Sequence, residues 1–174
     1  MDVLERILTT LAQEFSDLGQ VEHITRATLR LILAMFLGGL LGYEREVMGK
    51  AAGMRTHMLV CLGAAIFVMA LEQDGAEADA MSRVIQGIAA GVGFLGAGTI
   101  LKGQNISDVK GLTTAAGLWA SAAIGVAVGL GREATAVLST AIVLVVLHLM
   151  PLMVYPGART QPDDQADEKP GDRQ

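Results

Sequence analysis

The hydrophobic positions of this chain fall into long blocks, unlike the alternation of a half-buried strand or the spacing of an amphipathic helix. Polar positions gather in the short stretches between the blocks. A helix needs about 20 residues to cross the roughly 30 Å of hydrocarbon in a bilayer. The pattern therefore predicts an all-α, polytopic membrane protein with five transmembrane helices, over residues 28–43, 51–71, 84–101, 112–130 and 134–155.

The two ends of the chain differ from these blocks. Residues 1–25 carry apolar positions at helical spacing with charged residues between them, which predicts an amphipathic helix lying on the membrane or against a neighbouring subunit. Residues 156–174 are polar, acidic and contain proline, which predicts a disordered tail. We therefore expect an N-terminal helix (1–25), a membrane domain (26–155) and a tail (156–174).

Small residues recur inside the apolar blocks, often four positions apart. Small side chains let membrane helices approach closely, so these positions predict helix packing, either within one subunit or across a subunit interface. A homo-oligomer is expected, with a dimer favoured. The positions are Gly38 and Gly42; Gly87, Gly91, Gly93, Gly96 and Gly98; and Gly117, Ser121, Gly125 and Gly129.

Composition excludes several classes of function. The net charge of −5 lies outside the apolar blocks, and no basic patch indicates nucleic-acid binding. Cys61 is the only cysteine, which excludes an intramolecular disulfide and a zinc site built from thiolates. The sequence offers no zinc pair, no nucleophile with a base and no phosphate-binding loop, so we expect a protein that is not an enzyme.

Lysine and arginine set the expected orientation. Of the 13 such residues, eight lie in the loops after the first and third segments and in the tail, and five lie on the other side. Loops rich in lysine and arginine stay in the cytoplasm. We therefore expect the N-terminus in the periplasm and the C-terminus in the cytoplasm.

The first two segments are short and bring charged residues to one depth of the bilayer. Arg30 is expected to extend outward to the interface. At the inner end the first segment carries Glu44, Arg45 and Glu46, and the second carries Arg55 and His57; these five residues are expected to form one cluster. Charges at this depth are costly unless paired, so a Glu44–Arg55 or Glu46–Arg55 pair is expected.

Two interpretations of this cluster remain open. It is either a rim that fixes helix ends and topology, or a site for a cation or proton near the cytoplasmic mouth. Mg²⁺ prefers carboxylate oxygens, which Glu44 and Glu46 would supply, and it is the one candidate ligand in a chain for which no resident cofactor is expected. The other candidates for an ion site or charge network are Arg83, Asp108, Thr113, Thr114 and His148.

Four strings in this order resemble the MgtC/SapB family of bacterial inner-membrane proteins. They are LRLILAMFLGGLLGYERE (29–46), AGMRTHMLVCLGA (52–64), RVIQGIAAGVGFLGAGTILK (83–102) and VKGLTTAAGLWASAAIGVAVGLG (109–131). The resemblance implies five membrane helices with a cytoplasmic C-terminus. It also implies that the family's signature positions are Glu44, Arg45, Glu46, Arg55, Thr56, His57, Arg83, Gly93, Phe94, Gly96, Gly98, Gly111, Thr113 and Thr114.

The same resemblance implies a role in growth under magnesium limitation. Two hypotheses follow: a protein that handles Mg²⁺ or protons directly, and a non-transporting modulator that binds other membrane proteins such as ATP synthase. Many members carry a soluble domain after the fifth helix, and we expect this chain to lack it, because only the short tail follows residue 155.

Overall fold

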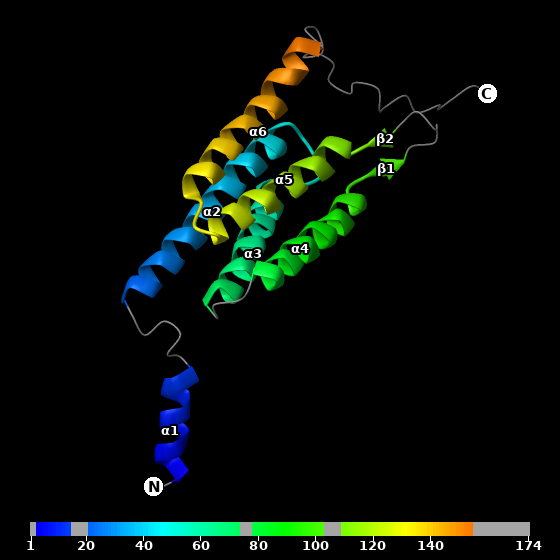
Figure 1. Ribbon diagram of the computed structural model, residues 1–174. Coiled ribbons are helices and arrows are strands. Elements are labelled where there is room, and N and C mark those ends of the chain that lie inside the picture. The colour runs from blue at the N-terminus through cyan, green and yellow to red at the C-terminus, as the bar shows by residue number, and fades with distance from the viewer. Residues whose placement is uncertain (1–2, 15–20, 74–77, 103–108, 155–174) are drawn as a thin grey trace, which may run out of the picture.

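The computed structural model describes residues 3–14, 21–73, 78–102 and 109–154, which form six helices and one short hairpin. The helices are α1 (Val3–Glu14), α2 (Val21–Val47), α3 (Met54–Gln73), α4 (Ala78–Gly98), α5 (Leu112–Gly129) and α6 (Glu133–Val154). Apart from α1, successive helices run up and down in one bundle (Figure 1). The expected all-α membrane architecture is confirmed.

Helix length supports the membrane assignment. Helices α2, α3, α4 and α5 are each long and apolar enough to cross a bilayer. Helix α6 is apolar over Glu133–His148 and completes the bundle as its fifth helix. The loop after α2, the hairpin and the C-terminal end of α6 lie together at one end of the bundle (Figure 1), so the loops richest in lysine and arginine share that end.

The helix bounds differ most from expectation in α2. This helix begins at Val21, inside the stretch expected to form the N-terminal helix, and it runs on to Val47. At 1.5 Å per residue its 27 residues span about 40 Å. The reason is that backbone hydrogen bonding does not stop at the edge of the hydrocarbon, so polar turns at both ends continue the helix into the headgroup layer. The N-terminal amphipathic helix is the shorter α1, whose side chains are exposed over residues 3–13.

A short antiparallel hairpin lies between α4 and α5, in one of the polar stretches between the apolar blocks. Strand β1 (Leu101–Lys102) pairs with β2 (Val109–Lys110), Leu101 opposite Lys110. Gly111 then starts α5 with a φ of 95°, and a Cβ there would lie 1.9 Å from the carbonyl oxygen of Thr99. Only glycine meets both demands, which explains why this turn needs it.

The centre of the bundle is α3, which lies between α2 and α5. On the α2 side, a Cβ on Gly42 would lie 2.5 Å from Cα of Met54. On the α5 side, a Cβ on Gly125 would lie 2.1 Å from the carbonyl oxygen of Cys61, and one on Gly129 would lie 2.8 Å from Cβ of Val68. The small residues therefore bring the backbones of three helices into direct contact.

Arg30 joins four helices at the opposite end from the hairpin. Its side chain is buried, pairs with Glu72 of α3, donates a hydrogen bond of 2.9 Å to the Gly129 carbonyl oxygen at the end of α5, and lies 3.7 Å from Glu133 of α6. A cation at a helix C-terminus is favourable, because the carbonyl groups there carry partial negative charge. The expectation that Arg30 extends outward is wrong, because the Glu72 and Glu133 carboxylates and the Gly129 carbonyl group contact its side chain inside the bundle.

Gly125→Ala tests the close contact between α3 and α5. The added methyl group would overlap the Cys61 carbonyl oxygen, so the helices must separate. Overpacking of this kind costs about 1–3 kcal/mol, which we expect to appear as a drop of several degrees in the melting temperature of the detergent-solubilised protein. Gly91→Ala is the matched control, since a Cβ at Gly91 meets no atom within 4 Å. Equal melting temperatures for the two variants would contradict the packing described here.

Candidate functional site

The inner end of α2 holds a buried arginine. Arg45 has 3% of its surface exposed, and both its Nε and Nη2 atoms donate to the carboxylate of Glu44. Nη2 also lies 3.4 Å from the carbonyl oxygen of Leu147 on α6. Arg45 thus links α2 to α6. One interpretation of the sequence placed Arg45 in a rim at the membrane edge, but its side chain is buried in the bundle.

Glu46 contacts a backbone amide, whereas Glu44 contacts a side chain. Its side chain is exposed, and Oε2 accepts a hydrogen bond of 2.8 Å from the amide of Met54, the first residue of α3. The carboxylate also covers Gly53, where a Cβ would lie 2.7 Å from Oε2. An acidic side chain that accepts from the first amides of a helix stabilises that helix, so Glu46 caps α3.

Arg55 pairs with neither glutamate. Within the described ranges the ion pairs are Arg30–Glu72, Arg30–Glu133 and Arg45–Glu44, and Arg55 is exposed in the first turn of α3. The expected Glu44–Arg55 or Glu46–Arg55 pair is therefore wrong. These residues lie at the same end of the bundle, but the rotation of each helix sets other partners: Glu44 is already neutralised by Arg45, and Glu46 accepts from the first amide of α3.

The two glutamates, expected to supply oxygen ligands to Mg²⁺, are bound to different partners in this structure. The Glu44 carboxylate is hydrogen-bonded to the Arg45 guanidinium, and the Glu46 carboxylate accepts from the backbone amide of Met54. A carboxylate paired with a guanidinium keeps its negative charge, but the arginine already compensates that charge. Among the described residues, three or more histidine, cysteine, aspartate or glutamate side chains nowhere gather as a metal site.

A polar track lies in the centre of the bundle, beside the glycines. His57 on α3 has no exposed surface, and its Nδ1 lies 3.0 Å from the carbonyl oxygen of Gly53. Its Nε2 points at α5, 3.3 Å from where a Cβ on Gly117 would stand. Thr114 and Ser121, one turn to either side of Gly117, are also buried. Neither His57 Nε2 nor Ser121 Oγ has a partner among the described residues.

The track contains one residue that sequence reasoning assigned to packing alone. Ser121 continues the small-residue ladder of α5, and that ladder does face α3. Its hydroxyl group is nevertheless buried without a partner among the described residues, and such buried polar atoms are rare enough to need an explanation. The signal in the sequence was that one of four ladder positions carries a hydroxyl group where the other three carry glycine.

The remaining candidates lie outside both the Glu44–Arg45 pair and the polar track of His57, Thr114 and Ser121. Arg83 on α4, Thr113 on α5 and His148 on α6 are exposed, and Asp108 lies outside the described residues. On α4, only Gly96 meets a neighbour, with Cβ of Ala115 at 3.3 Å. A Cβ on each of the other four would meet no atom within 4 Å, so packing inside this chain does not account for Gly87, Gly91, Gly93 and Gly98.

A double-mutant cycle on Glu44 and Arg45 tests their pairing. Removing one partner leaves a buried charge uncompensated, which costs about 3–5 kcal/mol, whereas removing both avoids that cost. We expect Glu44→Gln and Arg45→Gln each to lower the melting temperature more than the double variant does. Glu46→Gln is the control and loses only a cap, worth about 1 kcal/mol. Strictly additive losses would show that the two side chains are not coupled.

Comparison with known proteins gives a consistent picture. The MgtC family matches residues 31–154. SrpB of Synechococcus elongatus is 44% identical over 131 residues, covering 69% of this chain and 72% of that protein. MgtC of Salmonella typhimurium is 46% identical over 117 residues, covering 67% of this chain and 48% of that protein.

A third relative has a name that refers to magnesium. The "Putative magnesium transporter YhiD" of Escherichia coli K12 is 38% identical over 135 residues, covering 73% of this chain and 61% of that protein. The chain thus spans about half the length of MgtC and less than two thirds of YhiD. No solved structure matches. Because the family match covers α3 to α6 and the inner part of α2, where the Glu44–Arg45 pair and the polar track lie, this chain belongs to the MgtC family.

Proposed function

We propose that this protein serves magnesium homeostasis in the bacterial inner membrane by modulating other membrane proteins, and that it does not form a pore for Mg²⁺. The printed name of one relative, "Putative magnesium transporter YhiD", and membership of the MgtC family support the link to magnesium. In this proposal the N-terminus is periplasmic and the C-terminus cytoplasmic, in accord with the excess of lysine and arginine at the hairpin end.

One observation carries the proposal: the groups best suited to bind Mg²⁺ are already bound within the fold. Glu44 neutralises Arg45, and Glu46 caps α3. The centre of the bundle is closed by glycine contacts, where Gly42 and Gly125 leave no room even for a methyl group. A strongly hydrated divalent ion demands octahedral oxygen ligands and gives up its waters reluctantly, and a closed centre of this kind opposes its passage.

The outer face of α4 is the surface we assign to a partner. At 3.6 residues per turn, Ala90, Gly93 and Ala97 lie on one face, which points away from both α3 and α5. All three residues are exposed. A face of small residues lets a second membrane helix approach closely, either from another protein or from a second copy of this chain.

Enlarging the outer face of α4 tests this function. Gly93→Leu and Ala97→Leu would hold a partner helix away, so we expect each variant to lose co-purification with detergent-solubilised ATP synthase, the partner that the family resemblance suggests. Ala141→Leu adds the same bulk as Ala97→Leu to an exposed position of α6 and should keep the interaction. If neither the wild type nor Ala141→Leu retains ATP synthase, or if all variants retain it equally, this mode of action is wrong.

Direct handling of protons is the second candidate function. It is favoured by the polar track, in which His57 Nε2 and Ser121 Oγ are buried without described partners. Histidine is a common proton carrier, and ionisable side chains inside membrane helices often mark proton pathways. The same observation also fits a bound water, which would bridge the two atoms without any transport.

Flux measurements in liposomes separate the two candidates. Modulation predicts that the purified wild-type protein produces no Mg²⁺ or proton flux above that of empty liposomes. Direct proton handling predicts a proton flux that falls to the empty-liposome level in Ser121→Ala. An Mg²⁺ flux that survives in Glu44→Gln and Glu46→Gln would overturn the proposed modulator and would place the ion path away from both glutamates.

A further inference from the structure

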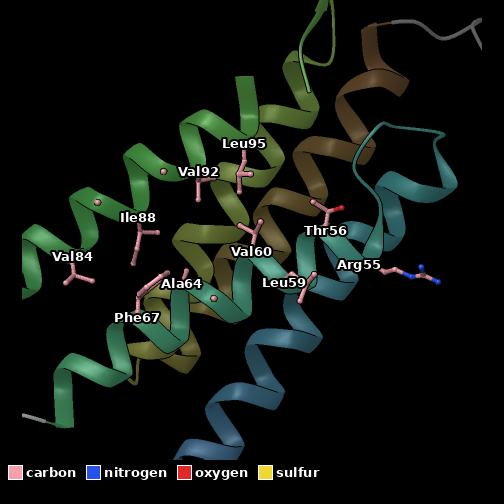
Figure 2. A pocket seen from close by; sticks show the side chains of 13 residues that line it. Arg55, Thr56, Leu59, Val60, Ala64, Phe67, Val84, Ile88, Val92 and Leu95 are labelled. Carbon is pink, nitrogen blue, oxygen red and sulfur yellow. The ribbon is translucent and has the colours of Figure 1, made fainter. Parts of the chain in front are cut away.

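An apolar groove of about 780 Å³ runs between α3 and α4. Its walls come only from α3 residues 55–67 and α4 residues 84–95. In Figure 2, Val84, Ile88, Val92 and Leu95 extend from α4 toward the α3 side, where Val60, Ala64 and Phe67 lie. Leu59 and Phe67 at its edge are mostly exposed, so the groove opens to the outside of the bundle. We call it the α3–α4 groove.

Glycines make the groove hollow. Gly63 on α3 and Gly87 and Gly91 on α4 all line it, and a Cβ on any of them would meet no atom within 4 Å. The floor is closed, because Ala64 and Val92 pack with Leu118 of α5. In a bilayer such a surface faces hydrocarbon, so its occupant must present an apolar body to it.

The two ends of the groove differ in chemistry. At one end lie Arg55 and Thr56, in the first turn of α3; at the other lie Phe67 and Val84. Arg55 is exposed, makes no ion pair within the described part of the chain, and extends outward from α3 in Figure 2. Glu46 already caps the first amide of α3, so the attraction for an anion at this end comes from the Arg55 guanidinium, which forms strong charge-assisted hydrogen bonds with phosphate. One end therefore suits an anionic phosphate, and the rest suits hydrocarbon.

The length of the groove also fits a lipid. From Arg55 to Phe67 there are 12 residue steps, or about 18 Å at 1.5 Å per residue. One leaflet of the hydrocarbon core is about 15 Å thick, half of the roughly 30 Å bilayer. A lipid with its headgroup at Arg55 would thus reach the far end of the groove with its acyl chain. A transmembrane helix would instead continue across the second leaflet, beyond the apolar walls.

We propose that the α3–α4 groove binds an anionic phospholipid from the leaflet on the hairpin side. Arg55 and the Thr56 hydroxyl hold the phosphate, and one acyl chain lies along Gly63, Gly91 and Phe67. Binding involves no covalent step. The site is separate from the outer face of α4, so it stands or falls independently of the modulator proposal.

Native mass spectrometry of the purified protein tests the site. Phosphatidylglycerol and phosphatidylcholine with identical acyl chains are added in turn, and the retained lipid is counted. We expect the wild type to retain phosphatidylglycerol preferentially, and Arg55→Gln to weaken its binding about tenfold, toward that of phosphatidylcholine, since a charge-assisted hydrogen bond is lost. Lys50→Gln removes an equal charge from the same end, outside the groove, and should bind as the wild type does.

A second variant tests the acyl position. Gly91→Leu fills the groove, and the open space at Gly91 lets the helix keep its fold, which circular dichroism checks. We expect it to retain less of both lipids; Gly87→Val serves the same purpose if Gly91→Leu misfolds. Equal retention of the two lipids by the wild type, or unchanged binding in Arg55→Gln, overturns the proposal. So does lipid retention unaffected by filling the groove, or a copurified polypeptide that the added lipid fails to displace.

Discussion

The bundle depends on the pairing of two buried cations on one helix. Arg30 and Arg45 are 15 positions apart on α2, or about 22 Å along its axis, so both lie within or at the edge of the hydrocarbon. An unpaired charge at such depth is costly. Arg30 meets this demand with Glu72 of α3 and the Gly129 carbonyl group of α5. Arg45 meets it with Glu44 of the same helix and the more distant Leu147 carbonyl group of α6. The contacts to other helices therefore help to fix the register of α2 against α3, α5 and α6.

Glycine contacts and charge pairs act together on the same helices. Gly38 and Gly42 bring α2 against α3, and Gly125 and Gly129 bring α5 against it from the other side. Gly129, which packs against α3, also supplies the carbonyl oxygen that accepts from Arg30. His57 and Ser121 are fully buried in this closely packed centre. The same residues that close the centre thus create its polar track.

The sequence was sufficient for the architecture because block length and small-residue spacing report directly on membrane helices. The face of α5 that carries Gly125 follows from a spacing of four, and the structure places it against α3. The partners of Arg30, Arg45 and Arg55 did not follow, since they depend on the rotation of each helix about its axis, on which depth in the bilayer gives no information. The hairpin at Leu101 and Lys110 also escaped prediction, because two-residue strands leave no periodic signal. Ser121 was recognised as small, but the burial of its hydroxyl group without a partner among the described residues became evident only in the structure.

The contacts of Arg30 have a consequence for biogenesis. A ribosome delivers α2 to the membrane first, yet the groups that satisfy Arg30 arrive with α3, with the end of α5 and with the start of α6. Until translation has passed Glu133, the early helix carries a cation whose final environment does not exist. Insertion and folding are therefore separated in time. The first helix must wait near the translocon or the lipid headgroups, and the bundle closes around Arg30 only when nearly the whole membrane domain has been made.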